Sequence, residues 1–106
     1  MINITFKPNT LELEIIGHSE HNEKGEDIVC AAISTLFYTL GQALYDSKEM
    51  LKEEPIFKDE EGNGIICCTP KEEYQGNISL IYMTILTGMQ LVAENYKENV
   101  SFKVRG

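Results

Sequence analysis

The chain has 106 residues, 42% of them hydrophobic, and a formal net charge of −8. This length fits one two-layer core but not two ordinary domains, so we expect a single domain over residues 1–106. The acidic excess disfavours direct binding to nucleic acid, whose affinity comes mostly from Lys and Arg contacts with phosphate. The first ten residues lack the charged and apolar regions of a signal peptide. No apolar run approaches the roughly 18 residues of a membrane span.

The chain contains three cysteines, and two of them, Cys67 and Cys68, are adjacent. An odd count with an adjacent pair argues against a disulfide framework, and the pair lacks the CxxC spacing of a redox motif. We therefore expect reduced thiols in a cytoplasmic protein without membrane association, with Cys67 and Cys68 on opposite faces of a strand.

Apolar periodicity predicts the secondary structure. Apolar residues alternate before and after the turn Lys7–Thr10, which indicates a β-hairpin. The spacing becomes helical from Asp27, which is placed as an N-cap residue, to about Asp46. The inward face of this first helix is expected to carry Val29, Ile33, Leu36 or Phe37, Leu40 and Leu44.

The second half contributes a buried strand at residues 65–69, a helix at 77–96 and a last strand at 99–104. The pair Ile56-Phe57 could add an edge strand, and Gly88 inside the helix suggests close packing. The second helix is expected to face inward with Ile78, Ile81 or Tyr82, Ile85, Met89, Val92 and Tyr96.

This element order predicts an α+β fold, with a mainly antiparallel sheet of four to five strands and two helices packed on one face. The other face of the sheet would then have no helical cover. If that face is apolar, self-association would cover it, and homodimers are the commonest oligomers.

Candidate chemistry is concentrated between Gly17 and Ser34, which holds both histidines and the first cysteine. His18 is expected at a strand end and Cys30 in the first turn of a helix, where positive partial charge stabilises a thiolate. A cysteine nucleophile needs a thiolate and a base, so Cys30 and His18 are candidate catalytic residues. The neighbouring acidic residues favour the protonated thiol. From the pattern alone, Cys30 as a small buried residue and His18 as a packing residue remain open alternatives.

The same segment also offers possible metal ligands in His18, His21, Asp27 and Cys30. Their spacing matches no zinc pattern, because zinc fingers use tighter ligand pairs. We expect no metal site.

The combined motif resembles the ribosomal-processing cysteine protease (Prp) family. Members carry a Gly-His pair, a flexible glycine-containing loop and a Gly-x-Asp-Ile-Val-Cys-Ala-Ala-x-Ser helix start, which correspond here to Gly17-His18, residues 19–24 and Gly25–Ser34. The resemblance implies a homodimeric α+β protease without a cofactor, in which Cys30 is the nucleophile and His18 the general base. It also implies a substrate: the N-terminal extension of the precursor of large-subunit ribosomal protein twenty-seven, cut after an aromatic residue.

Other residues of the motif are assigned supporting roles. Asp27 could orient the site or only cap the helix, and Ser34, one turn beyond Cys30, could face the substrate or pack. The alternative function is a non-catalytic, ribosome-associated binding module that holds a basic protein tail against the acidic loop. The predicted flexible loop comprises Gly17, Ser19, Glu20, His21, Asn22, Glu23, Lys24 and Gly25.

Overall fold

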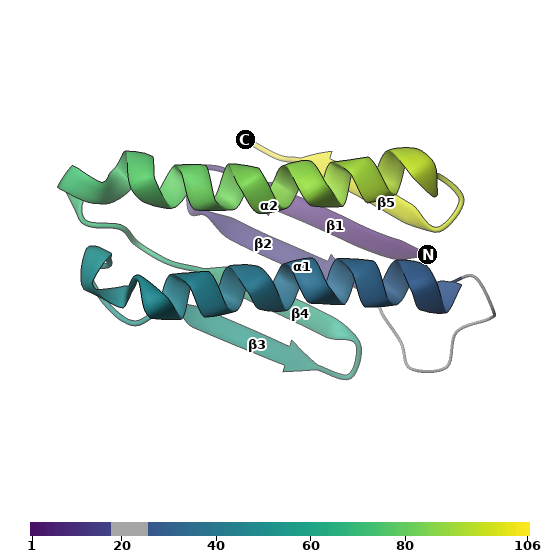
Figure 1. Cartoon of the computed structure of the whole chain (residues 1–106), viewed down its shortest axis with the longest axis horizontal. Helices are drawn as coiled ribbons and strands as arrows, with labels where there is room; N and C mark the ends of the chain where they lie inside the picture. The colour runs from purple at the N-terminus through teal and green to yellow at the C-terminus, as the bar shows by residue number, and fades with distance from the viewer. Residues whose placement is uncertain (18–25) are drawn as a thin grey trace.

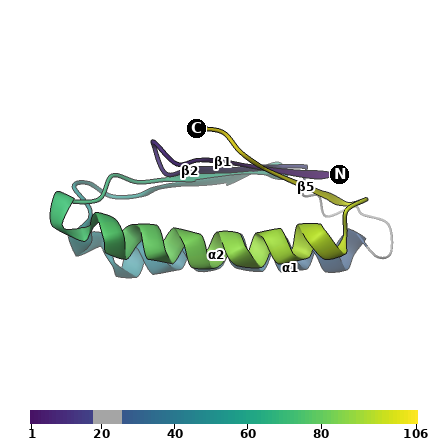
Figure 2. The ribbon, with the colours of Figure 1, turned by 90° about the horizontal axis from the view of Figure 1, so that it is seen from above.

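The computed structural model describes the chain except for residues 18–25, and for Glu26 and Asp27 it describes only the backbone. Two layers are present: a five-stranded sheet and two long helices that lie side by side on one of its faces (Figures 1 and 2). The elements are β1 (Ile2–Lys7), β2 (Glu12–Ile16), α1 (Glu26–Asp46), η1 (Lys48–Met50), β3 (Ile56–Glu60), β4 (Asn63–Cys67), η2 (Glu72–Tyr74), α2 (Gln75–Asn95) and β5 (Val100–Val104).

The strand order across the sheet is β3-β4-β2-β1-β5. Neighbours pair antiparallel except β1 and β5, which run parallel, so the sheet is mixed. The α+β prediction is confirmed, and so is the edge strand near Ile56. The parallel pair forms because α2 brings the chain back to the start of β1, where the Ile2 N–H donates to the Asn99 carbonyl at 2.8 Å.

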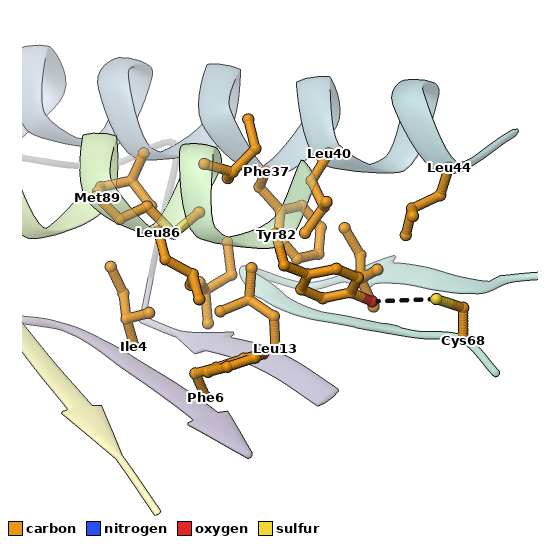
Figure 3. Packing of buried hydrophobic residues seen from close by; sticks show 14 of the residues in the cluster. Ile4, Phe6, Leu13, Phe37, Leu40, Leu44, Cys68, Tyr82, Leu86 and Met89 are labelled. Atoms are coloured by element: carbon orange, nitrogen blue, oxygen red, sulfur yellow. Dashed lines mark hydrogen bonds between the residues drawn. The ribbon is translucent and has the colours of Figure 1, made fainter. Parts of the chain in front are cut away.

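The core lies between the helices and the sheet (Figure 3). The predicted inward face of the first helix is confirmed. Of the two alternatives Leu36 and Phe37, Phe37 is the fully buried one. On α2 the prediction is confirmed for Ile78, Tyr82, Ile85 and Met89, but it is wrong for Tyr96, because α2 ends at Asn95 and Tyr96 is exposed.

Two glycines determine how closely α1 approaches its neighbours. Gly64 of β4 lies under the ring of Phe37, where an added Cβ would be 2.6 Å from Phe37 Cζ. At Gly88 of α2, an added Cβ would be 3.0 Å from Leu36 Cδ2, which confirms the predicted close packing. These contacts show that Leu36 points from α1 toward α2.

Candidate active site

Cys30 lies near the start of α1 and is half-buried, packed against the hydrophobic core. The helix begins at Glu26, one residue earlier than predicted, so Cys30 is its fifth residue and lies just past the first turn. The predicted N-cap position of Asp27 is therefore wrong, because its backbone is already helical. Packing against the core restricts the orientation of the Cys30 side chain.

The contacts of α1 show which flank Cys30 occupies. Successive residues of an α-helix turn by about 100°, so residues eleven positions apart point within about 20° of each other. Gly41, eleven residues after Cys30, faces the Phe57 ring on β3, because an added Cβ there would overlap that ring. Cys30 therefore lies on the flank of α1 that faces away from α2, toward the β3 edge. Ser34 is half-buried on the same flank, one turn further along.

The end of β2 reaches the same end of the molecule as the start of α1 (Figures 1 and 2). Gly17 follows β2 with a φ of +97°, and an added Cβ there would be 2.5 Å from the Met1 carbonyl oxygen. Its N–H donates to the Gly62 carbonyl at 3.1 Å. Only glycine fits this position without strain. Gly17 therefore anchors the chain immediately before His18.

Several predicted site residues lie outside the described part of the chain. His18 and the predicted loop residues Ser19, Glu20, His21, Asn22, Glu23, Lys24 and Gly25 belong to this group, as does the side chain of Asp27. The pairing of His18 with Cys30 stays a prediction. Among the described residues, no group of three or more His, Cys, Asp or Glu side chains could hold a metal ion.

The other two cysteines lie at the opposite end of the molecule, near a cleft of about 750 Å³. Cys68 is buried, and its Sγ lies 3.6 Å from the Tyr82 hydroxyl (Figure 3). Burial raises the pKa of both the Cys67 and Cys68 thiols, and Glu12 and Glu53 raise that of Cys67 further. Both groups therefore stay protonated at neutral pH, which makes them poor nucleophiles.

Two structural features around β2, β3 and α1 were not predicted from the sequence. The Gly62 turn was recognised, but not its hydrogen bond to Gly17, because that contact joins distant segments. The cluster of Phe57, Tyr38 and Phe37 was also missed. The sequence signal for this cluster was Gly41, because a glycine inside a helix often marks close packing against another element.

The fold and the half-buried helix cysteine define an α+β protein with a candidate thiol site. A family model described as cysteine protease Prp matches residues 1–101. The chain therefore belongs to the Prp family of cysteine proteases.

Similar proteins agree with this assignment. A ribosomal processing cysteine protease Prp of Staphylococcus aureus is 29% identical over 101 residues, covering 93% of this chain and 92% of the relative. A crystal structure of the S. aureus Prp protease in complex with a substrate peptide matches with a TM-score of 0.78 and 25% identity, over 99% of this chain and 100% of the other. The protein SMU.848 of Streptococcus mutans matches with a TM-score of 0.73 and 26% identity, over 97% and 90% of the two chains.

Proposed function

We propose that this protein is a cysteine endopeptidase that removes the N-terminal extension of the precursor of large-subunit ribosomal protein twenty-seven. The observation that carries the proposal is the family match over residues 1–101, a range that includes His18 and Cys30. The relatives named ribosomal processing proteases, and the relative bound to a substrate peptide, support a peptide substrate of this kind. Cys30 is the proposed nucleophile because it belongs to the motif Gly25–Ser34 at the start of α1, and burial raises the pKa of the other two thiols, which disfavours their thiolates.

In the proposed mechanism, His18 accepts the proton of the Cys30 thiol and the Cys30 sulfur attacks the scissile carbonyl carbon. The oxyanion accepts hydrogen bonds from N–H groups of the first turn of α1, which have no carbonyl partner within the helix. Collapse of the tetrahedral intermediate breaks the C–N bond, and His18 returns the proton to the departing amine. Water then hydrolyses the thioester, which releases the extension as a carboxylate and regenerates Cys30.

The direct test incubates purified protein with the extended precursor and identifies the new N-terminus by mass spectrometry. Cys30→Ala and His18→Ala should each lower kcat/KM by at least about 1000-fold, because loss of a nucleophile or its base removes most of the catalysis. Cys67→Ser is the matched control and should keep wild-type activity. Intact precursor that binds tightly to the wild-type protein would instead support the alternative of a non-catalytic binding module.

We also propose that the protein acts as a homodimer and that its interface is the outer face of the helix layer. No charged residue occurs between Asp27 and Asp46 in α1 or between Gln75 and Ala93 in α2. The outer face exposes large apolar side chains, namely Ile28, Leu80, Met83 and Leu91. Two chains that each carry a net charge of −8 can meet there without bringing like charges together.

The uncovered face of the sheet is less suited to self-association than the sequence suggested. Its strands alternate, and the residues that point away from the helices include many charges, namely Lys7, Glu12, Glu14, Lys58, Glu60 and Lys103. The helix layer, by contrast, offers about 600 Å² per chain, estimated as two helices of roughly 30 Å by 10 Å. That area approaches the roughly 800 Å² per partner of a standard interface.

Sedimentation or light scattering of the purified protein tests the dimer. Leu80→Glu places a charge on the helix face and should shift the protein to monomers. Asn3→Glu adds the same charge to the uncovered sheet face and should leave the dimer intact. A wild-type monomer at micromolar concentration, or equal effects of the two substitutions, would contradict this interface.

The proposed location is the cytoplasm. All three cysteines are thiols in the structure, as expected in a reducing compartment. Contrary to the expectation from the sequence, both α1 and α2 are long and apolar enough to cross a membrane by length and composition, a property that core helices of globular proteins share. Here their inward faces form the core beneath the sheet. Flotation with lipid vesicles should leave the protein in the soluble fraction, and vesicle binding would contradict this assignment.

A further inference from the structure

An aromatic pocket of about 330 Å³ lies on the flank of α1 that carries Cys30. The rings of Tyr38 and Tyr45 on α1 and of Phe57 on β3 line it. Gly41 leaves room for the Phe57 ring at the base of the pocket, because any larger residue would overlap that ring. The pocket is open to solvent and large enough for one big side chain.

Contacts with neighbouring side chains hold Phe57 and Tyr38 of the pocket in place. Phe57 packs against the buried Phe37, with ring centroids 5.2 Å apart, and against Tyr38 at 5.5 Å. The Tyr38 hydroxyl donates a hydrogen bond to Asp59 of β3. Even so, 39% of Phe57, 50% of Tyr38 and 54% of Tyr45 remain exposed. Ordered aromatic rings that stay exposed together are typical of a surface that binds a partner.

The pocket is aligned with the proposed nucleophile. Cys30, Ser34, Tyr38 and Gly41 follow one another along the same flank of α1. The eleven residues from Cys30 to Gly41 span about 16 Å at 1.5 Å per residue. An extended peptide rises about 3.3 Å per residue, so it would cover this distance in about five residues. The neighbouring strand β3 is the edge of the sheet, a position at which extended peptides commonly bind.

We propose that this pocket is a remote subsite of the protease, which binds an aromatic side chain of the substrate about five residues from the cleaved bond. This inference rests on the proposed function. Stacking against the exposed rings and removal of the side chain from water would supply the binding energy. Lys48 and Glu54 also line the pocket, and Lys48 lies over the Tyr45 ring, 4.6 Å from its centroid.

The test combines substrate and enzyme variants. A series of cleavable peptides carries a single Phe or Ala at each position from three to seven residues on either side of the cleaved bond. With wild-type enzyme, kcat/KM should be about tenfold higher for Phe than for Ala at one position near five, as expected for burial of one aromatic side chain. Tyr45→Ala should remove this preference, and Tyr45→Phe should recover it. Gln42→Trp, which fills the pocket from an exposed position on α1, should also remove it.

The matched control is Tyr96→Ala, which removes an exposed tyrosine outside the pocket and should keep the preference for Phe. The subsite is refuted if Tyr45→Ala lowers kcat/KM equally for the Phe and Ala peptides, or if no position shows a preference. A change confined to the oligomeric state would refute it too, because the rings would then belong to a subunit contact. If the wild-type protein cleaves no peptide at all, the proposed function fails rather than the subsite.

Discussion

The two glycines that seat α1 should respond in opposite ways to replacement by alanine. At Gly64 the new Cβ would lie 2.6 Å and 2.8 Å from two ring atoms of Phe37 and 3.2 Å from Ile15 Cγ1, against 3.4–4 Å for ordinary contact. Phe37 and Ile15 are fully buried and cannot move aside. Overpacking of this kind costs about 1–3 kcal/mol, and the entropy gained by replacing glycine recovers only about 0.5–1 kcal/mol. Gly64→Ala should therefore lower the free energy of unfolding by about 1–2 kcal/mol.

At Gly88 the closest atoms are the two terminal methyl groups of Leu36, at 3.0 Å and 3.2 Å. Leu36 is only half-buried, so its flexible end can shift by a few tenths of an ångström. Alanine in a helix interior gains about 1 kcal/mol over glycine. Gly88→Ala should therefore leave the free energy of unfolding unchanged or raise it by up to about 1 kcal/mol.

Urea and thermal unfolding of the two variants measure this difference. A change of 1 kcal/mol shifts the Tm by about 4 °C in a chain of this size, so the two variants should differ by roughly 8 °C. Gly64→Ala should also lower peptidase activity, because Phe37 belongs to the helix that carries Cys30. Equal stability of the two variants would refute the packing argument, as would a Gly88→Ala variant that is less stable than Gly64→Ala.

Two further predictions concern titration. Burial raises the pKa of Tyr82 far above 10.0, so its ionisation favours the unfolded chain. Stability should be complete below pH 10 and fall above it, by about 1.4 kcal/mol at pH 11 relative to neutral pH. Tyr82→Phe should remove this loss in pH-dependent unfolding, and an unchanged pH profile would contradict it. In a Cys30→Ser, Cys68→Ser background, alkylation of Cys67 should have a midpoint above the ordinary thiol value of 9.0, because burial and Glu12 oppose the thiolate. A midpoint at or below that value would refute this assignment.

Much of the fold could be predicted because each element has one buried face. The spacing of Val29, Ile33, Leu40 and Leu44 is enough to define the inward side of α1. The parallel pairing of β5 with β1 could not be predicted, because it depends on where α2 ends relative to the start of β1. The misplacement of Tyr96 has a similar cause, since periodicity continues past the point where the helix stops.

Less of the site could be predicted. The motif singled out Cys30 and its position near a helix start, and the structure places it in the second turn of α1. The flank on which it lies follows only from tertiary contacts, namely Gly41 with Phe57 on one side and Gly88 with Leu36 on the other. No local pattern contains that information, because an isolated amphipathic helix does not specify its lateral neighbours.

Charge and apolar surface are separated on this molecule, and that separation has a consequence for substrate binding. Neither helix carries a charge between Asp27 and Asp46 or between Gln75 and Ala93, so the excess of acidic residues lies at the helix ends and in the loops. Attraction of a basic peptide should therefore weaken with salt, whereas stacking in the pocket of Tyr38, Tyr45 and Phe57 should not. For wild-type enzyme, kcat/KM for all peptides should fall between 50 mM and 500 mM salt, while the ratio between Phe and Ala peptides stays about tenfold. A ratio that collapses with salt would mean that charge, rather than the rings, selects the substrate.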